Sequence, residues 1–356
     1  MKFDDLQALI REARSPLRIT GHGSKDFYGE VPHGEPLSTL ALNGITAYEP
    51  SELFISALAG TPLADVETAL TENRQRLAFE PPRFDGKGTI GGVVAAGLSG
   101  PTRAAFGSVR DHLLGAVLIN GAGELLSFGG TVMKNVAGFD VSRVLAGSMG
   151  QLGLITEVTL KVLPLPAATS TLRFEFNQSA ALMAVNRWGG EPLPIEASAW
   201  WDGALLVRLA GAHAAVEAAT RKLGGDVIPA DLAAPFWTGL RDHADEFFIG
   251  AERAVAGGAR LWRLSLPSTA PELKLHGEQL VEWGGAQRWV VTPLPPAGVR
   301  EAAAAVGAHA TCFRALDKAC GAFTPLSAPL AAIHRRLKAT FDPHRVFNPG
   351  RLYPEL

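Results

Sequence analysis

The chain has 356 residues, enough for two domains with hydrophobic cores, and 47% hydrophobic with 19% charged residues is an ordinary globular balance. A formal net charge of −2 gives no basic surplus for binding nucleic acid, and two cysteines are too few for a disulfide framework or a four-thiolate iron–sulfur cluster. The sequence holds neither an apolar run of about 20 residues nor a signal-peptide pattern, so we expect a cytoplasmic protein without a transmembrane helix.

The first 166 residues combine short apolar segments with glycine-rich turns. Apolar residues at helical spacing come first, and short apolar runs bounded by Gly, Asn and Pro follow them. These patterns predict helices over 3–14 and from Pro62 to about Asn73, and strands at 17–20, within 37–60, at 113–120 and at 154–162. Glycine-rich segments therefore lie at the ends of several predicted strands.

The composition changes after residue 166. Strand-like runs at 172–176, 204–209, 261–266 and 288–291 alternate with alanine-rich stretches at 212–223 and 271–283, for which we predict helices. A last helix is predicted at 326–337, followed by an irregular, Pro-containing tail at 341–354. The pattern predicts an α+β protein with three parts, 1–166, 167–325 and 326–356.

The segment Gly86–Gly91 spells G-x-G-x-x-G, the nominal dinucleotide fingerprint, and Asp111 lies twenty residues beyond it. That motif should follow a buried strand, but the preceding residues 80–85 do not form a strand core. The acidic residue should end a strand, but Asp111 precedes one. The context therefore disfavours a Rossmann site.

Several separate turns give a better interpretation. Gly21–Lys25 follows the first predicted strand, and its glycines allow backbone N–H groups to converge on an anion, with Ser24 adding a hydroxyl and Lys25 a charge. The segment 89–101 lets a planar ligand approach the backbone closely. Alone, the first could be a plain turn and the second a tightly packed small-residue helix. Three glycine-rich segments within 155 residues are harder to explain in that way.

The third segment, Gly129–Pro164, carries the most specific pattern. It places Lys134-Asn135, Gly138-Phe139-Asp140 and a Gly-Ser-x-Gly-x-x-Gly turn ahead of an apolar strand. With the two earlier segments and the tail motifs at 341–343 and 348–350, it resembles the PCMH-type FAD-binding domain of vanillyl-alcohol-oxidase-type flavoproteins. Within that superfamily it is most similar to the FAD-binding subunits of bacterial glycolate oxidase, also called glycolate dehydrogenase. The likeness covers about 15–166 and 336–353.

The resemblance implies an FAD domain of two α+β subdomains, a second α+β cap domain for partner contact, and a C-terminal tail that returns to the FAD domain. It implies FAD contacts from Gly21, His22, Gly23, Ser24, Lys25, Asp26, Gly88, Thr89, Ile90, Gly91, Gly92, Ser99, Gly100, Phe106, Gly107, Gly150, Gly153, Ile155 and Asn348. The first turn would cradle the pyrophosphate, Ile155 would lie near the adenine and Asn348 near the isoalloxazine. Gly23 separates His22 from Ser24, so noncovalent FAD is expected rather than FAD linked to a histidine.

Oxidising a 2-hydroxy acid needs a cation for the carboxylate and a base for the hydroxyl proton. Related catalytic flavoproteins carry a His-x-Gly-Asp-Gly-Asn segment, and this chain has none. His309 and Arg314 are weak candidates, with a structural histidine and a surface salt bridge as the alternatives. The catalytic residues stay unknown, and no metal site is expected.

The resemblance therefore implies an FAD-binding, electron-transfer subunit that supports oxidation of glycolate to glyoxylate. Its partners would be a larger homologous FAD-containing catalytic subunit and an iron–sulfur subunit, in the cytoplasm or peripheral to the inner membrane through the complex. Two alternatives stay open: a self-sufficient FAD-dependent 2-hydroxy-acid or alcohol oxidoreductase, and a structural subunit with a vestigial flavin site.

Overall fold

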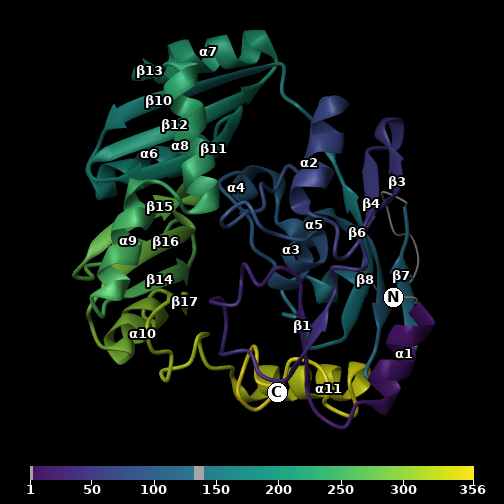
Figure 1. The fold of residues 1–356 in the computed structure, drawn as a ribbon. Helices are drawn as coiled ribbons and strands as arrows, with labels where there is room; N and C mark the ends of the chain where they lie inside the picture. Colours follow the sequence, from purple (N-terminus) through teal and green to yellow (C-terminus); the bar gives the residue numbers. More distant parts are fainter. Residues whose placement is uncertain (1–2, 132–139) are drawn as a thin grey trace. The chain divides into compact units, whose positions relative to one another are not determined.

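The computed structural model describes residues 3–131 and 140–356, and they divide into two compact units (Figure 1). The first unit comprises Met1–Leu98, Ser108–Pro164 and Pro325–Leu356; the second comprises Ser99–Gly107 and Leu165–Thr324. The sequence places residues 99–107 with the first 166 residues, whereas the structure assigns them to the second unit. There the short helix α4 (Arg103–Phe106) packs on strand β11 (Ile195–Trp201).

The first unit is built on a five-stranded antiparallel sheet with the order β3-β4-β8-β6-β7. Its strands are β3 (Ile45–Glu49), β4 (Phe54–Leu58), β6 (Leu113–Ile119), β7 (Leu125–Gly129) and β8 (Leu154–Lys161). Two small sheets accompany it: a parallel pair of β1 (Leu17–Thr20) with β2 (Glu35–Ser38), and an antiparallel pair of β5 (Gln75–Arg76) with β9 (Leu163–Pro164). The antiparallel sheet excludes the Rossmann alternative for this unit.

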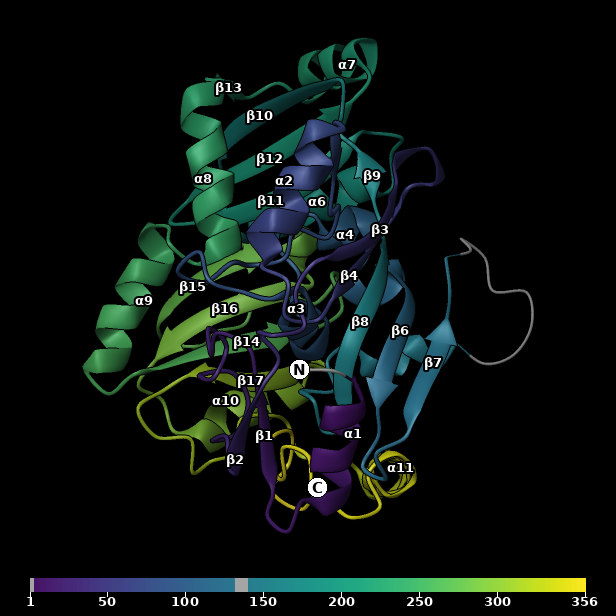
Figure 2. The ribbon, with the colours of Figure 1, turned by 45° about the vertical axis from the view of Figure 1, so that its right-hand side comes forward.

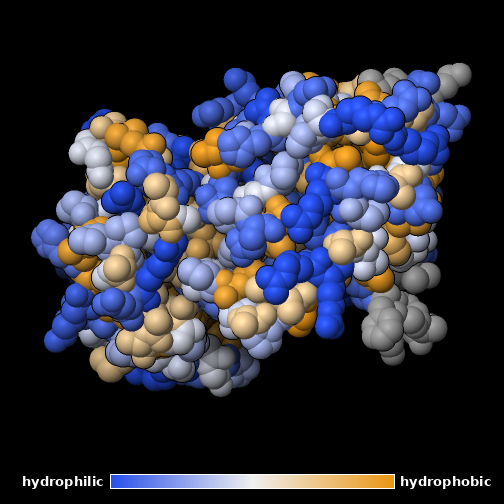
Figure 3. Space-filling model, turned by 90° about the horizontal axis from the view of Figure 1, so that it is seen from below, coloured by the Kyte–Doolittle hydropathy of each residue, from blue (hydrophilic) through white to orange (hydrophobic). Residues whose placement is uncertain are grey.

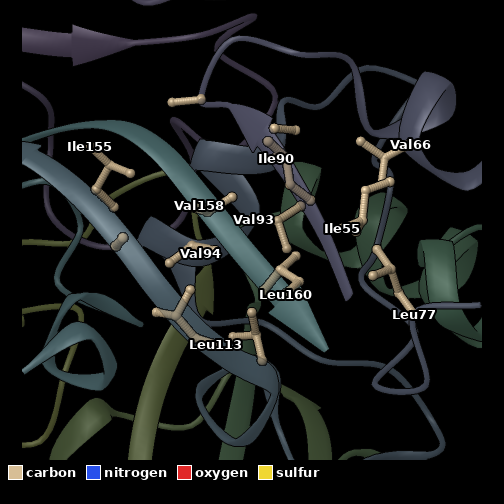
Figure 4. Close-up of a cluster of buried hydrophobic side chains, with 14 of the residues drawn as sticks. Ile55, Val66, Leu77, Ile90, Val93, Val94, Leu113, Ile155, Val158 and Leu160 are labelled. Carbon is tan, nitrogen blue, oxygen red and sulfur yellow. The ribbon is translucent and has the colours of Figure 1, made fainter. Parts of the chain in front are cut away.

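Helices cover this sheet and enclose its core. The unit holds α1 (Phe3–Glu12), α2 (Leu63–Glu72), α3 (Ile90–Ala96), α5 (Val109–His112) and α11 (Ala328–Phe341), with 3-10 turns at η1 (Pro50–Glu52) and η2 (Ser142–Leu145). Val66 of α2 and Val94 of α3 are fully buried against the sheet residues Ile55 and Val158 (Figure 4). Each such side chain contributes about 1.5–3 kcal/mol on burial. Close approach requires Gly91, because a Cβ there would lie 2.6 Å from the Ala59 Cβ.

The C-terminal segment belongs to the first unit, as the family resemblance implies. Lys338 on α11 is almost fully buried, and its Nζ donates to Asp342 Oδ2 at 2.6 Å, to the Gln151 carbonyl at 2.8 Å and to the Phe347 carbonyl at 2.8 Å. Phe347 also forms a parallel bridge with Leu17 of β1. One buried ion pair with satisfied hydrogen bonds thus anchors the tail beside the first strand.

The second unit is an eight-stranded antiparallel sheet with the order β13-β10-β12-β11-β15-β16-β14-β17. Besides β11, it is formed by β10 (Ala168–Glu175), β12 (Ala204–Gly211), β13 (Asp226–Ile228), β14 (Arg260–Ser265), β15 (Glu278–Glu282), β16 (Gln287–Thr292) and β17 (His309–Arg314). Its other helices are α6 (Gln178–Gly189), α7 (His213–Leu223), α8 (Ala230–Asp242), α9 (Glu246–Ala256) and α10 (Pro296–Ala304), with a 3-10 turn at η3 (Trp283–Gly285). The four strand-like runs and the helix at 212–223 are confirmed.

Helices pack on both faces of this sheet (Figure 2). Leu172 of β10 joins the apolar cluster formed with α6 and α7, whereas the adjacent Thr171 accepts a hydrogen bond from Trp237 of α8. In the other half, Trp262 of β14 packs in the cluster with α10, whereas Trp289 of β16 stacks edge-on against Phe248 of α9. Because alternate residues of a strand point to opposite faces, α6, α7 and α10 cover one face and α8 and α9 the other.

The prediction of a helix at 271–283 is wrong. The structure has an irregular segment there, followed by β15, which fills the place between β11 and β16. The fully buried Arg288 of β16 donates to the carbonyls of Ala270 and Pro271 and, at 3.4 Å, to that of Gly285. Tertiary pairing and this guanidinium therefore override the local helix propensity.

Over residues 3–131 and 140–356, no helix combines the length and apolarity needed to span a membrane. The face seen from below mixes hydrophilic and hydrophobic residues (Figure 3).

Candidate functional site

The first glycine turn follows β1 and leaves its backbone donors available. The N–H of Asp26 donates to the Gly23 carbonyl at 3.0 Å, which closes the turn, and Gly23 has a φ of +72°. The five N–H groups from Gly21 to Lys25 donate to no acceptor in the described chain. Successive unpaired N–H groups in such a turn suit an anion, because each can donate to it without displacing another bond.

Lys25 adds a positive charge to this turn. Its ammonium lies 5.7 Å from the centre of the Phe84 ring and 3.5 Å from the Ser24 hydroxyl. Burial lowers the Lys25 pKa from the usual 10.5 to about 8. An anion bound beside the ammonium would reverse part of this shift, so the lysine is poised for a negatively charged ligand.

The second glycine segment meets the first turn. A Cβ on Gly21 would lie 2.8 Å from the Thr89 Oγ1, and a Cβ on Gly88 would lie 3.5 Å from the Lys25 Nζ. Thr89 is the N-cap of α3, and its Oγ1 accepts the N–H of Gly92 at 3.2 Å. The first segment therefore needs glycine at position 21 to fit against the Thr89 side chain, whereas a Cβ on Gly88 would make an ordinary contact with Lys25.

Two other predicted residues of this segment serve packing. Ile90 is buried in the core, and its N–H donates to the Thr61 carbonyl at 2.9 Å. Gly91 lies against Ala59, and its N–H donates to the Ala59 carbonyl at 2.9 Å. Both residues position α3 relative to the sheet.

The third glycine segment runs along α3. The N–H of Gly147 donates to the Val94 carbonyl at 3.0 Å, and the N–H of Met149 donates to the Ala95 carbonyl at 2.8 Å. A Cβ on Gly97 would lie 2.8 Å from the Gly147 Cα, so two glycines meet at this crossing. Three segments that are distant in sequence therefore converge, as the sequence suggests.

Asn348 joins the tail to two of these parts. Its Oδ1 accepts the Ile19 N–H at 2.8 Å, and its Nδ2 donates to the Met149 carbonyl at 2.7 Å. A Cβ on Gly150 would lie 2.6 Å from that Nδ2. The amide holds β1 and the third segment together, and its expected place near an isoalloxazine stays a prediction.

Arg351 is a site residue that the sequence analysis missed. It is 6% exposed, and its Nη2 donates to the carbonyls of Lys25 at 3.2 Å and Asp26 at 3.0 Å, while its Nη1 is buried without a hydrogen-bond partner in the described chain. Burial lowers the Arg351 pKa, and the nearby Asp26 opposes that shift. The only signal in the sequence is a basic residue directly after Asn348-Pro349-Gly350.

These residues line a small cavity of about 90 Å³. Its lining is Thr20, Gly21, His22, Gly23, Ser24, Lys25, Asp26, Thr89, Gly92, Ala95, Ala96, Met149 and Arg351. This volume is small, so the cavity can hold a small anionic group of a ligand rather than a whole dinucleotide. The arrangement of N–H groups, one lysine and one arginine can bind a phosphate or diphosphate group.

A second cavity of about 320 Å³ lies beside the same third segment. Apolar side chains, including Val144, Leu152 and Leu337, line it together with Arg110 and Arg143. Arg143 forms an ion pair with Asp140 at 2.6 Å. Lys134, Asn135, Gly138 and Phe139, which precede this pair, lie outside the described residues.

Two predicted cofactor residues have structural contacts in and before β8. A Cβ on Gly153 would lie 2.7 Å from the Ile119 carbonyl, so its side of the sheet admits only glycine. Ile155 is buried and pairs with Leu118 across the sheet, next to a register shift. Its expected contact with an adenine stays a prediction.

Four other predicted cofactor residues belong to the second unit: Ser99, Gly100, Phe106 and Gly107. The carbonyl of Gly100 accepts the indole N–H of Trp283 at 3.0 Å, and Phe106 and Gly107 end α4. The ring of Trp283 also lies 4.6 Å from the Arg103 guanidinium. Gly100 therefore has a hydrogen-bond partner within the second unit, and Phe106 and Gly107 belong to the end of its helix α4.

The weak catalytic candidates stand at opposite ends of β17. His309 is exposed at the start of the strand, and Arg314 ends it, so the two are about 17 Å apart at 3.4 Å per residue. The Arg314 Nη2 lies 3.6 Å from Glu252 Oε1, with both side chains partly exposed. The salt bridge proposed as the alternative for Arg314 is present, and the two residues do not form one site.

Comparison with known proteins gives results of three kinds. The family described as FAD binding domain matches residues 2–129. The chain is 45% identical over 359 aligned residues to glycolate oxidase subunit GlcE of Escherichia coli K12, covering 99% of both chains. It is 31% identical to a D-lactate dehydrogenase of Anaerostipes hadrus over 46% of this chain and 34% of that protein. A solved structure of alkyldihydroxyacetonephosphate synthase has a TM-score of 0.65 at 14% identity, covering 97% of this chain and 75% of that one, which bears on the fold alone.

Proposed function

The chain belongs to the family of glycolate oxidase subunit GlcE, FAD-dependent oxidoreductases, and we propose that it is the FAD-binding subunit of a complex that oxidises glycolate to glyoxylate. In this proposal, electrons pass through its flavin to a partner subunit that carries iron–sulfur clusters. A larger homologous flavoprotein subunit supplies the substrate-oxidising site.

The turn Gly21–Lys25 and Arg351, which donates to the Lys25 carbonyl, are the residues on which the proposed cofactor site depends. Five unpaired N–H groups, an ammonium whose pKa burial lowers to about 8, and a buried guanidinium nitrogen without a partner fit the diphosphate of FAD. Backbone N–H groups would hold its oxygens, and Lys25 and Arg351 would balance its charge. When bound, FAD supplies an isoalloxazine ring that accepts two electrons.

The second and third glycine segments would then flank the cofactor. Thr89 and Gly92 line the same cavity as the first turn, and Met149 lines it from the third segment. Asn348 would hold the third segment and β1 at a fixed separation through its two hydrogen bonds. These residues position the cofactor; none of them is proposed to move a proton.

Two features favour a partner role over a self-sufficient enzyme. The chain lacks the His-x-Gly-Asp-Gly-Asn segment, and Arg314, its best carboxylate-binding candidate, is already paired with Glu252. Its two cysteines cannot hold an iron–sulfur cluster by themselves. In this proposal, the iron–sulfur clusters are therefore carried by another subunit.

The test is the visible spectrum of the purified chain, before and after anaerobic glycolate, alone and with its partner subunits. We expect a yellow protein whose flavin stays oxidised alone and bleaches when the partner subunits are present. Bleaching of the isolated chain would favour the self-sufficient oxidoreductase. A chain that stays colourless after incubation with FAD would overturn the proposal and favour the vestigial site. Acid precipitation should release the flavin into the supernatant if its binding is noncovalent.

A further inference from the structure

The cavity of about 320 Å³ lies entirely within the first unit. One wall comes from α11 and the C-terminal tail, drawn in yellow in Figure 1, and the other comes from α5, η2 and the residues that follow η2. Its volume is at the lower end of the range of about 300–1,000 Å³ that is typical of small-molecule sites. The cavity is therefore large enough for a small organic ligand.

The interior of this cavity is apolar. Leu152, Leu337, Leu352 and Leu356 line it, and Leu152 and Leu356 are buried. The main-chain oxygen of Leu356 already accepts the Gly350 N–H at 2.6 Å. Such a lining favours an alkyl or aryl group, because this group leaves water without losing hydrogen bonds of its own.

Two nitrogen-bearing side chains lie where the cavity meets solvent. Arg110 on α5 is exposed, and His334 on α11 is partly exposed. Neither side chain forms a hydrogen bond or an ion pair with another described residue; the His334 ring only lies edge-on to Tyr353, with 5.9 Å between ring centres. Both side chains can therefore donate to a ligand without giving up a bond within the described chain.

The other two basic residues of the lining are already engaged. Arg143 pairs with Asp140 at 2.6 Å, and the Lys338 Nζ donates to Asp342 and to two carbonyls. None of the described residues that line the cavity has an acidic side chain. The cavity thus has a positively charged opening and an apolar interior, a combination that suits an anionic group attached to an apolar one.

We propose that this cavity binds a small amphipathic carboxylate, an alkyl or aryl acid. Its apolar part would lie against the leucines, and its carboxylate would accept hydrogen bonds from Arg110 and His334. A two-carbon hydroxy acid such as glycolate has no such apolar part, so this ligand is not the substrate of the proposed function. The proposal does not rest on that function.

The proposed carboxylate site is separate from the proposed diphosphate site but lies next to it. The two cavities share no lining residue within the described chain. Ser148 lines the larger cavity, and the following Met149 lines the smaller one. Gly147 and Met149 donate to carbonyls of α3, which hold this segment in place. Both ligands can therefore be bound at the same time.

The test is calorimetric titration of the full apoprotein with octanoate, with acetate and 1-octanol as controls. We expect saturable binding of one octanoate per chain, no binding of acetate, which lacks the chain, and weaker binding of 1-octanol, which lacks the charge. Arg110→Met should bind octanoate about fivefold more weakly, the scale of a partly exposed ion pair. Arg336→Met, which removes an exposed arginine of α11 outside the lining, should bind octanoate as the wild-type chain does.

A second variant fills the cavity. Ala146 lines it in an extended backbone conformation, with φ of −67° and ψ of 115°, that accepts a larger side chain, so Ala146→Phe should abolish octanoate binding. Urea unfolding checks that the variant is folded. If it is not, Arg110→Met and the competition with FAD decide the matter.

Three results would overturn the proposal. The first is the absence of saturable octanoate binding by the wild-type apoprotein. The second is unchanged binding by Arg110→Met or by folded Ala146→Phe, because the acid then binds elsewhere. The third is displacement of octanoate by FAD, because the cavity then belongs to the cofactor. A chain that binds octanoate but no FAD would contradict the proposed function and leave the carboxylate site supported.

Discussion

Replacing Arg351 by Met tests the proposed cofactor site most directly. The substitution keeps much of the side-chain volume and removes the guanidinium that contacts the Lys25 and Asp26 carbonyls. Two effects follow, a looser first turn and the loss of a positive charge beside the place proposed for the diphosphate. Both reduce FAD affinity.

The size of each effect follows from the geometry. The Nη2 bonds at 3.2 Å and 3.0 Å join a charged donor to neutral carbonyls, and their loss should lower the free energy of unfolding by about 2 kcal/mol. A unit charge about 5 Å from an anion contributes about 3 kcal/mol at an effective dielectric constant of roughly 20. We therefore expect FAD to bind about 100-fold more weakly to Arg351→Met. Arg351→Lys keeps the positive charge but loses the planar guanidinium that can donate several hydrogen bonds, so its affinity for FAD should fall about tenfold.

The assay is titration of the apoprotein with FAD, followed by flavin fluorescence, together with urea unfolding of the same apoprotein. Arg336→Met is the matched control, because Arg336 is an exposed arginine on α11 and its loss changes the net charge equally. The control should bind FAD as the wild-type chain does.

One result would refute the reasoning. If Arg351→Met unfolds at lower urea but binds FAD with unchanged affinity, the guanidinium only supports the tail, and the diphosphate lies elsewhere. Equal losses in Arg351→Met and Arg336→Met would show that net charge, rather than the position of the guanidinium, governs binding.

Three further predictions follow from the same unit. Gly21→Ala would place a Cβ 2.8 Å from the Thr89 Oγ1, so it should lower the free energy of unfolding by about 1–3 kcal/mol and reduce the flavin content of the purified protein. An unchanged ratio of flavin absorbance to protein absorbance would contradict this expectation. Lys338→Met would leave the buried Asp342 carboxylate without its cation, so urea unfolding should show a loss of about 3–5 kcal/mol, and a loss below about 1 kcal/mol would mean that the pair is dispensable. The Lys25 pKa of about 8 lies below its usual 10.5, and a bound anion raises it; FAD affinity should therefore be constant below pH 8 and fall by up to tenfold per pH unit above it, a slope that Lys25→Met should abolish.

The parts of the candidate site that depend on neighbouring residues in the sequence could be predicted from the sequence. A strand that ends in glycine, a threonine that caps a short helix and a third glycine segment before an apolar strand are each recognisable from neighbouring residues. The structure places β1, Thr89 and the third segment together as expected. The G-x-G-x-x-G spacing at 86–91 was rightly set aside, because the sheet of this unit is antiparallel and Gly91 packs against Ala59, just beyond β4.

The failures have one physical cause, which is partners distant in sequence. The segment 271–283 has the composition of a helix, but β15 completes a sheet whose neighbouring strand β11 lies about 80 residues earlier, and Arg288 takes the carbonyls that a helix would use. Arg351 reads locally as one basic residue in a Pro-containing tail. Its hydrogen-bond partner Lys25 is 326 residues away in the sequence, and no neighbouring residue indicates this contact.

The distance between these partners also bears on how the site can be stable. A turn with five unpaired N–H groups gains little from its own hydrogen bonds, so its shape must be set from outside. That support comes from the other end of the chain, since Asn348 and Arg351 hold β1 and the turn, and Lys338 with Asp342 holds the tail that carries them. The C-terminal segment is therefore part of the anion site as well as part of the fold. A ligand in the turn should stabilise the tail, because it binds a shape that only the docked tail maintains.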